Sequence, residues 1–378
     1  MRIVIDYRAA LKTRTGVGEY THQLASALLS TGSAPDGSHL DLTLFSSSSK
    51  DRLLTQRDLP GAKVVDRRVP VSVLNFAWHR LGWPNVELLA GTQFDVAHSM
   101  HPLLMPTRSA AQVVTIHDLN FLLHPERTSA EIKRDYPVLV RQHANRADQV
   151  IVVSEFTAAE VGRLLDVPGD HISVCSPGAP PWARRHAESF DGYVLFFGTL
   201  EPRKNVGTLL DAWELLVSQR NDLPTLLLAG KATEQAAGWL ERIARPPLKD
   251  RVKHVGYVAP DERPRLYEGA RLLVQPSFEE GFGLPVLEAM TVGVPVIAAN
   301  AGALPEVGED AVLLVPPTDP REMADAIARL LDDRALASRC AERGVKRASH
   351  YSWERTAETT LDAYARAIAR RVRRRGAA

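Results

Sequence analysis

The fold class of this chain can be predicted from residues 271–300, RLLVQPSFEEGFGLPVLEAMTVGVPVIAAN. This stretch opens with a short apolar run closed by Pro276 and Ser277, which is typical of a buried parallel strand. A glycine-rich loop follows, and Pro285 suits the first turn of a helix. The second apolar run, VPVIAAN, predicts another strand. Strand, helix and strand in this order predict a βαβ unit of a parallel sheet.

Two carboxylates, Glu280 and Glu288, lie in this unit with seven residues between them. Ligands of open α/β sheets bind beyond the carboxyl ends of the strands, so both side chains can reach one crevice. A carboxylate can hold neighbouring hydroxyls of a ribose or a hexose, and free backbone amides between the two suit an anion. The pattern therefore predicts a nucleotide sugar, although the spacing alone also fits two solvated glutamates that favour a helix dipole.

The same alternation continues along most of the chain. Apolar runs that predict strands alternate with amphipathic stretches that predict helices, as in parallel sheets. One series of predicted strands lies at residues 2–7, 40–46, 95–99, 111–118, 148–154 and 172–178, and a second at 193–200, 224–230, 252–258, 271–277, 294–300 and 311–317. We therefore predict an α/β chain of two doubly wound domains facing a cleft. The linker is placed at residues 179–192, where prolines and charges interrupt the periodicity.

The composition excludes several classes of protein. A chain of 378 residues is long enough for two domains, and a formal net charge of +1 gives no overall field typical of a nucleic-acid binder. The cysteines Cys175 and Cys340 have no metal-ligand spacing and suggest no disulfide framework, which fits a reducing compartment and predicts the cytoplasm. No signal-peptide core or membrane-spanning apolar run is found, so any membrane contact is expected to be peripheral.

Two segments could make such a peripheral contact. The arginine-rich end of the chain, residues 365–378, fits either a solvated helix end or attraction to anionic lipid. The segment 69–89 places Trp78 and Trp83 among apolar and basic residues. It could form an acceptor groove, touch a membrane surface, or fold as a buried helix pair.

Three motifs in a fixed order carry a resemblance to a known family. They are TGVGEYTHQL at 15–24, FFGTLEPRKN at 196–205 and FEEGFGLPVLEAM at 278–290. Together they resemble the retaining glycosyltransferases of family 4, which have the GT-B fold of two Rossmann-like domains facing a central cleft. The resemblance implies that a domain at 1–185 binds the acceptor and that one at 186–352 binds the nucleotide sugar. A last helix, 353–378, would cross back to the first domain.

The resemblance also assigns roles to the two carboxylates and the loop between them. Glu288 matches the glutamate that holds the ribose hydroxyls of the donor, and Glu280 matches the one that holds hydroxyls of the donor hexose. The loop would present main-chain amides to the sugar and open the helix whose N-terminus faces the phosphates. Its donor-binding residues would be Gly281, Phe282, Gly283 and Leu284.

Arg203 and Lys204 follow the first strand of the second series and precede a helix. Two cations at a helix N-terminus suit a diphosphate, whose charge grows as the nucleoside diphosphate departs. Lys204 matches the usual lysine of the family, whereas Thr199 stands where many relatives have an arginine. A solvated surface pair is the structural alternative.

Gly16 and Gly18 lie between the first strand and its helix, where glycine can bring backbone amides against the β-phosphate. Thr21 stands where a third glycine would complete the dinucleotide fingerprint, so a plain tight turn is the alternative.

Other candidates also follow strands. His117 matches a histidine that the family places against the donor sugar, and Asp118 would orient it or face the acceptor. His98 ends a neighbouring strand and is a further candidate. In the second series, Lys231 would lie near the phosphate or base, and the base would contact Tyr257 and Val258.

The implied reaction is transfer of a hexose from a nucleotide sugar to an acceptor hydroxyl with retention of the anomeric configuration. His117, Asp118, Glu280, Arg203 and Lys204 are the expected catalytic residues, and no Asp-x-Asp motif predicts a metal, so no cofactor is expected. The motifs resemble the mannosyltransferase branch of bacterial surface polysaccharide synthesis, with GDP-mannose as donor and a glycan or lipid-linked glycan as acceptor. The alternatives are a UDP- or dTDP-hexose donor, a sugar-nucleotide epimerase, and a non-catalytic nucleotide-sugar-binding protein.

Overall fold

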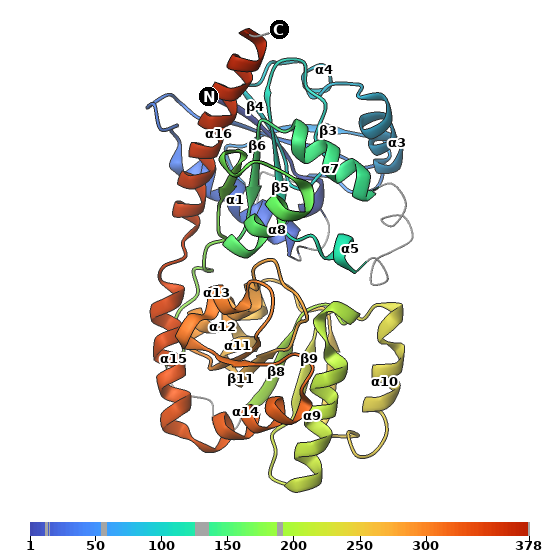
Figure 1. Cartoon of the computed structure of the whole chain (residues 1–378), viewed down its shortest axis with the longest axis vertical. Helices are drawn as coiled ribbons and strands as arrows, with labels where there is room; N and C mark the ends of the chain where they lie inside the picture. Colours follow the sequence, from blue (N-terminus) through green and yellow to red (C-terminus); the bar gives the residue numbers. More distant parts are fainter. Residues whose placement is uncertain (12–13, 15, 54–58, 125–135, 187–191, 377–378) are drawn as a thin grey trace. The chain divides into compact units, whose positions relative to one another are not determined.

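Two parallel sheets organise the chain, as the alternation of strands and helices predicts. The computed structural model describes residues 1–376 apart from 12–13, 15, 54–58, 125–135 and 187–191. Unit 1 consists of residues 1–178 and 352–378, and unit 2 of residues 179–351 (Figure 1). Each unit is a Rossmann-like α/β layer structure, so the prediction of two doubly wound α/β domains is confirmed.

The sheet of unit 1 has seven parallel strands in the order β3-β2-β1-β4-β5-β6-β7. The strands are β1 (Arg2–Asp6), β2 (Asp41–Ser47), β3 (Lys63–Arg67), β4 (Val96–Ser99), β5 (Ala111–Ile116), β6 (Gln149–Val152) and β7 (Ile172–Val174). The described helices are η1 (Arg8–Ala10), α1 (Val17–Thr31), α3 (Val71–Phe76), η2 (Ala77–Leu81), α4 (Val86–Ala90), α5 (Asn120–Leu123), α7 (Tyr136–Arg146), α8 (Glu155–Leu165), η4 (Gly169–His171) and α16 (Trp353–Gly376). β1 is central and buried, with Ile3 opposite Leu42 on β2 and Val96 on β4.

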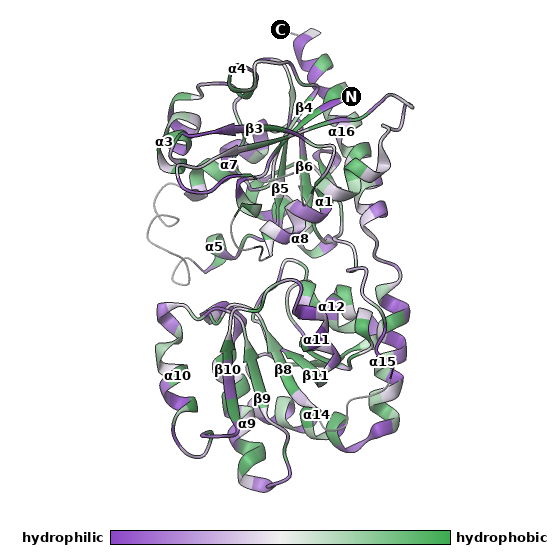
Figure 2. Ribbon diagram, turned by 180° about the vertical axis from the view of Figure 1, so that it is seen from behind, coloured by the Kyte–Doolittle hydropathy of each residue, from purple (hydrophilic) through white to green (hydrophobic). Residues whose placement is uncertain are grey.

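The sheet of unit 2 has six parallel strands in the order β10-β9-β8-β11-β12-β13. They are β8 (Tyr193–Phe197), β9 (Leu226–Ala229), β10 (Val252–Gly256), β11 (Ala270–Gln275), β12 (Val296–Ala299) and β13 (Leu313–Val315). The described helices are η5 (Pro202–Lys204), α9 (Val206–Gln219), η6 (Glu234–Ala236), α10 (Ala237–Ile243), α11 (Arg263–Glu268), α12 (Leu284–Val292), α13 (Leu304–Gly308), η7 (Glu309–Ala311), α14 (Pro320–Asp332) and α15 (Arg334–Ala348). The strands are largely apolar, whereas α10 and α15 alternate between polar and apolar residues (Figure 2).

Each sheet has one point where the strand order reverses. In unit 1, β2 and β3 are added on one side of β1, and β4 to β7 are added on the other side. In unit 2, β9 and β10 lie on one side of β8, and β11 to β13 lie on the other. The carboxyl ends of β1 and β4, and those of β8 and β11, are therefore the two places where a parallel sheet opens a crevice for a ligand.

The end of the chain packs on unit 1. Helix α16 lies against α1, β5 and β6, and its apolar stripe includes Ala357, Leu361, Tyr364 and Ala367. The Tyr364 hydroxyl lies 2.7 Å from Nδ1 of His98 on β4. This buried contact joins the C-terminal helix to the central part of the sheet.

The predicted linker begins where unit 2 begins. Arg185 donates its backbone N–H to the carbonyl of Val292 (3.0 Å), and its Nη1 donates to the carbonyl of Ala270 (2.6 Å). This part of the segment therefore packs on unit 2, and residues 187–191 lie outside the described residues.

Candidate active site

The carboxyl ends of β8 and β11 bring three of the predicted residues together. Arg203 and Lys204 lie on η5, which follows β8, and Glu280 lies in the loop after β11. Lys204 Nζ is 2.5 Å from Glu280 Oε1, and Arg203 Nη1 is 3.0 Å from Glu280 Oε2. Glu280 is buried, so these ion pairs are shielded from bulk water. A carboxylate and two cations thus occupy the reversal point of the unit 2 sheet.

Neutral donors complete the surroundings of Glu280. Ser277 Oγ and Gln275 Nε2 donate to Oε1 at 2.6 and 2.9 Å. Oε1 therefore accepts three hydrogen bonds, whereas Oε2 accepts one, from Arg203, among the described residues. Because a carboxylate oxygen has two lone pairs, Oε2 keeps room for one more donor such as a sugar hydroxyl.

The charges of this cluster stabilise one another. Burial by itself would raise the pKa of Glu280, but the charges of Lys204 and Arg203 and the hydrogen bonds from Lys204 and Ser277 lower it to about 2. Burial also lowers the pKa of Lys204 and outweighs the raising effect of Glu280. Glu280 is consequently a carboxylate at neutral pH, and the ammonium beside it would gain from a further anion.

A glycine that sequence reasoning did not single out holds the backbone of Glu280 in place. Gly302 has a φ of +60°, and a Cβ on it would lie 2.7 Å from the backbone N and O of Glu280. The neighbouring Ala303 donates its N–H to the Glu280 carbonyl at 2.9 Å. Only glycine fits this close approach, so the loop after β12 helps to position Glu280.

The other loop residues lie between Glu280 and α12. Gly281, Phe282 and Gly283 precede the helix, and Leu284 is its first residue. The Phe282 ring is buried edge-on against Tyr351, with ring centroids 5.5 Å apart. The start of α12 is therefore anchored by an aromatic contact within unit 2.

Glu288 is buried on α12 and held by two side chains of α11. Tyr267 Oη donates to Glu288 Oε2 at 2.7 Å, and Arg263 Nη1 lies 3.6 Å from Oε1. Arg263 and Tyr267 are four residues apart and therefore share one face of the helix. Burial and the nearby Glu288 charge raise the pKa of Tyr267, which keeps its hydroxyl protonated as a donor. Sequence reasoning missed both residues, although the i, i+4 spacing in RPRLY was a usable signal.

The remaining predicted residues of unit 2 follow β9 and β10, the two strands on the other side of β8. Lys231 follows β9, and Tyr257 and Val258 follow β10. Lys231 Nζ lies 5.0 Å from the centroid of the Tyr257 ring, a cation–π contact. The structure therefore brings Lys231 and Tyr257 together at the carboxyl edge of the sheet.

In unit 1, the predicted glycines lie at the start of α1. Gly16 is the N-cap residue and Gly18 is the second residue of the helix. A Cβ on Gly18 would lie 2.6 Å from the carbonyl oxygen of Ala9, so the close packing of α1 against η1 already requires glycine there. Gly16 has open space around its Cβ position.

His117 and Asp118 directly follow β5. Within the described residues, His117 Nε2 is buried without a hydrogen-bond partner, and the ring meets Tyr20 edge-on at 5.0 Å. Burial lowers the pKa of His117 to about 4, against the raising effects of Asp118 and the Met100 backbone. A neutral imidazole with one unused nitrogen can hydrogen-bond a ligand hydroxyl. By contrast, both nitrogens of the buried His98 are occupied, by Tyr364 and Thr115, which is a structural role.

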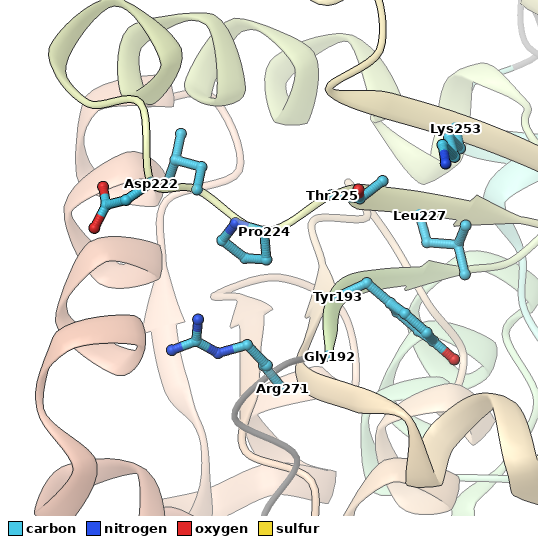
Figure 3. A pocket seen from close by; sticks show the side chains of 9 residues that line it. Gly192, Tyr193, Asp222, Pro224, Thr225, Leu227, Lys253 and Arg271 are labelled. Carbon is cyan, nitrogen blue, oxygen red and sulfur yellow. The ribbon is translucent and has the colours of Figure 1, made fainter.

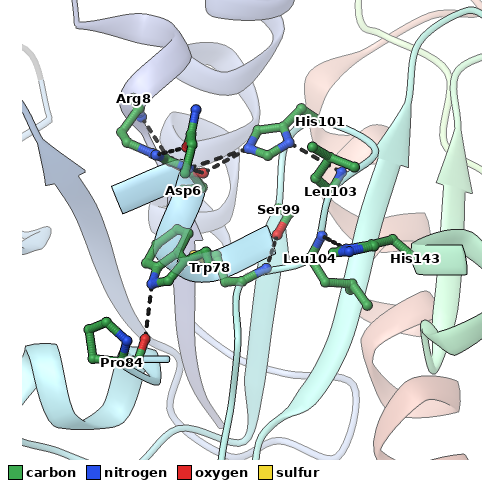
Figure 4. Close-up of polar contacts among 11 residues, drawn as sticks. Asp6, Arg8, Trp78, Pro84, Ser99, His101, Leu103, Leu104 and His143 are labelled. Carbon is green, nitrogen blue, oxygen red and sulfur yellow. Dashed lines mark hydrogen bonds and ion pairs between the residues drawn. The ribbon is translucent and has the colours of Figure 1, made fainter. Parts of the chain in front are cut away.

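A polar cluster that the sequence analysis did not identify occupies the reversal point of the unit 1 sheet (Figure 4). Asp6 ends β1 and is almost fully buried, and Arg8 binds both of its carboxylate oxygens at 2.8 and 2.7 Å. His101 Nε2 lies 3.1 Å from Asp6 Oδ2, while its Nδ1 accepts the N–H of Leu103. The Arg8 guanidinium lies over the Trp78 ring at 4.8 Å. The spacing Asp-x-Arg after the first strand was the available signal.

A separate hollow of about 550 Å³ lies at the amino ends of the unit 2 strands, away from the predicted site (Figure 3). Its lining includes Tyr193, Thr225, Lys253 and Arg271, at or next to the amino ends of β8 to β11. None of the predicted site residues lines it. Because parallel sheets bind ligands at their carboxyl ends, this hollow is not the predicted donor site.

No group of three or more His, Cys, Asp or Glu side chains in the described ranges is arranged to hold a metal ion. Within the same ranges, every helix is too short or too polar to cross a bilayer.

Two family models and several relatives match this chain. A family model described as Glycosyltransferase Family 4 matches residues 14–181, and one described as Glycosyl transferases group 1 matches residues 191–333. The chain is 34% identical over 273 residues to the O-antigen chain mannosyltransferase B of Escherichia coli, across 69% of this chain and 71% of that protein.

Solved structures resemble the whole chain. The sucrose-phosphate synthase of Thermosynechococcus elongatus has a TM-score of 0.80 at 22% identity, covering 98% of this chain and 99% of the other. Anabaena HepE in complex with UDP and glucose has a TM-score of 0.71 at 19% identity, covering 96% and 98%. At these identities the two structures show the fold alone.

Proposed function

This chain belongs to the family 4 glycosyltransferases, and on that premise we propose that it transfers mannose from GDP-mannose to a hydroxyl of a glycan or lipid-linked glycan, with retention of configuration. The relative that is 34% identical is an O-antigen chain mannosyltransferase. Its name favours mannose as the sugar and a growing cell-surface polysaccharide as the acceptor. A lipid-linked acceptor would place the enzyme in the cytoplasm at the inner face of a membrane.

The buried cluster of Glu280, Lys204 and Arg203 is the observation that supports this proposal most strongly. It sits where a doubly wound sheet binds ligands, and it combines two cations with a carboxylate that has an acceptor position to spare. In the proposed complex, the cations bind the diphosphate and Oε2 of Glu280 accepts a hexose hydroxyl. Glu288, oriented by Tyr267 and Arg263, accepts the ribose hydroxyls.

The proposed reaction proceeds on one face of the sugar. The bond between the anomeric carbon and the phosphate oxygen breaks, the acceptor oxygen forms the new bond from the same side, and the acceptor proton passes to the departing phosphate oxygen. Arg203 and Lys204 stabilise the charge that grows on that phosphate, in the role that a divalent cation fills in metal-dependent enzymes. The neutral His117 donates or accepts one hydrogen bond to a sugar hydroxyl.

The acceptor side of the proposal rests on unit 1. Asp6, Arg8 and His101 lie at the reversal point of its sheet, in the position that Glu280, Arg203 and Lys204 occupy in unit 2. A charged, partly open cluster at such a point suits a hydroxyl-rich ligand.

A panel of nucleotide sugars tests the donor. Purified full-length protein is mixed with GDP-mannose, UDP-glucose and a dTDP-hexose in EDTA, and binding and slow release of the nucleotide are measured, with GDP and UDP as controls. Selective binding and metal-free hydrolysis of GDP-mannose would support the proposal. Selective binding of a UDP or dTDP sugar would instead identify that sugar nucleotide as the donor. Binding without any turnover, even when acceptor is added, would indicate a non-catalytic protein.

A further inference from the structure

Exposed apolar side chains concentrate in one segment of unit 1. Half of the large hydrophobic side chains that are exposed in the described part of the chain fall within residues 71–88. They are Val71, Val73, Phe76, Leu81, Trp83 and Leu88, each between 42% and 66% exposed. The other six are scattered over the two units, so exposed apolar side chains are concentrated in this one segment.

The exposure of these side chains is fixed by how the segment is anchored. α3 and η2 form one continuous helical stretch, in which Leu74 and Trp78 are buried in a core cluster with Phe45. Trp78 Nε1 also donates to the Pro84 carbonyl at 2.9 Å. Val73 and Phe76 lie on the face that points away from this anchor. Turning them inward would pull Trp78 out of the core.

The charged residues around this surface have one sign. Arg67, Arg68 and Arg80 are exposed, whereas the two acidic residues between 63 and 90 are less accessible: Asp66 is half-buried and Glu87 is buried. Asp66 accepts from Ser46 Oγ, and the buried Glu87 accepts the backbone N–H groups of the 108–110 loop. A local excess of cations therefore borders the apolar side chains, although the whole chain has a net charge of only +1.

The arginine-rich end of α16 extends this cationic border. Arg375 Nη2 donates to the Arg108 carbonyl at 2.8 Å, and the N–H of Arg108 is held by Glu87 on α4. One loop therefore ties the last turn of α16 to the helix that carries Leu88. Both elements lie at the same end of unit 1 (Figure 1).

We propose that this apolar and basic face, formed by Val71, Val73, Phe76, Leu81, Trp83 and Leu88 with Arg67, Arg68, Arg80 and the end of α16, docks on the surface of an anionic lipid bilayer. The aromatic and aliphatic side chains enter the interface between headgroups and acyl chains, and the arginines meet the anionic headgroups. A second copy of the chain is the less favourable occupant, because two identical cationic borders would face and repel each other. The inference deepens the proposed function by naming the surface on which a lipid-linked acceptor would be met, but it does not depend on the donor.

Vesicle binding tests this inference. Full-length protein is sedimented with vesicles of phosphatidylcholine alone and with vesicles of equal parts phosphatidylcholine and phosphatidylglycerol. We expect binding to the anionic vesicles that weakens with salt, and a loss of about tenfold in the partition coefficient for Phe76→Ser combined with Trp83→Ser. The matched control is Val138→Ser combined with Val255→Ser, which removes apolar side chains of similar exposure elsewhere and should leave binding unchanged.

Two further measurements keep the result interpretable. Circular dichroism and GDP affinity show whether the Phe76 and Trp83 variants retain the fold, and sedimentation velocity without lipid shows whether the face mediates self-association. The inference would be overturned if the wild type did not bind anionic vesicles, or if the Phe76→Ser, Trp83→Ser variant bound them as well as the wild type. A dimer that these two substitutions dissociate would also overturn it. Vesicle binding without any nucleotide binding would instead count against the proposed function alone.

Discussion

At the scale of single residues, Glu280 is a buried carboxylate whose two oxygens have different surroundings. Three donors occupy Oε1, including Lys204, whereas Oε2 has only Arg203 in the described part of the chain. In the proposed function, Oε2 accepts a hydroxyl of the donor sugar, and the carboxylate also holds the two cations where the diphosphate would bind. A substitution that keeps the shape and removes the charge separates these two roles.

We expect Glu280→Gln to lower kcat for sugar transfer about a hundredfold while the Kd for GDP changes less than about threefold. The reason is that GDP has no hexose, and the diphosphate itself can keep the cations in place. Steady-state kinetics and calorimetric titration with GDP measure the two quantities. The control is Glu201→Gln, which removes the half-exposed partner of Arg203 and should have a small effect. If GDP binding collapses in Glu280→Gln, the residue acts mainly by positioning Arg203 and Lys204.

Tyr267→Phe tests how Glu288 is oriented. The change removes the hydroxyl that donates to Glu288 Oε2, so we expect the Kd for GDP to rise about tenfold with kcat nearly unchanged. Tyr193→Phe is the matched control, because its hydroxyl donates to the Leu266 carbonyl and not to Glu288. Both variants should lose some stability in urea. Equal GDP affinity in the two variants would show that Tyr267 has only a structural role.

At the scale of elements, α16 is held to unit 1 by contacts far apart in sequence. Tyr364 on α16 meets His98 on β4, and Arg370 Nη1 donates to Gln149 Oε1 at the start of β6 (2.6 Å). The helix packs on α1 and on the strands β4 to β7, so the last described segment of the chain completes the packing of unit 1.

Removing the Tyr364 hydroxyl from this interface should measurably lower the stability of unit 1. We expect Tyr364→Phe to lower the free energy of unfolding of unit 1 by about 1–2 kcal/mol, because a buried nitrogen of His98 loses its partner. Urea unfolding followed by hydrogen exchange of unit 1 peptides reports this change. GDP affinity, which we assign to unit 2, should stay the same. An unchanged unfolding midpoint would mean that the contact makes no net contribution.

At the scale of the whole molecule, the two units should respond differently to acid. Burial lowers the pKa of His98 and His79 to about 3, and that of His117 and His143 to about 4, and all four histidines belong to unit 1. Their folded pKa values lie below the unfolded value of about 6.5, so the folded state favours the neutral form. Their contribution to stability is complete above pH 6.5 and declines as the pH falls toward 3.

Unit 1 should therefore lose stability as the pH falls from 7 to 5. In unit 2, the contribution of Glu280, whose pKa lies at about 2, is lost only as the pH falls below about 4.5. Hydrogen exchange measured by mass spectrometry at several pH values resolves the two units. In His98→Gln, the loss of unit 1 stability between pH 7 and pH 5 should be smaller than in the wild type. A parallel loss of protection in both units would contradict this assignment.

Much of the architecture could be predicted from local patterns. Every strand that the apolar runs predicted is present, because a strand buried on both faces of a parallel sheet needs a nearly continuous apolar sequence. β3 was missed because it is an edge strand, and its residues Lys63, Asp66 and Arg67 interrupt the apolar signal.

Local sequence patterns were sufficient to predict the two parallel sheets, the family, and which residues follow strand ends and so gather where the carboxyl ends of parallel strands meet. That rule was enough to bring Arg203 and Lys204 to Glu280, although the roles of the site residues stay predictions. The partners of those residues, by contrast, depend on how the elements pack in the folded chain. Arg263 and Tyr267 on α11 contact Glu288 on α12, and Gly302 in the loop after β12 lies against the backbone of Glu280. Such contacts depend on helix packing and backbone approach between segments distant in sequence, which no local pattern encodes.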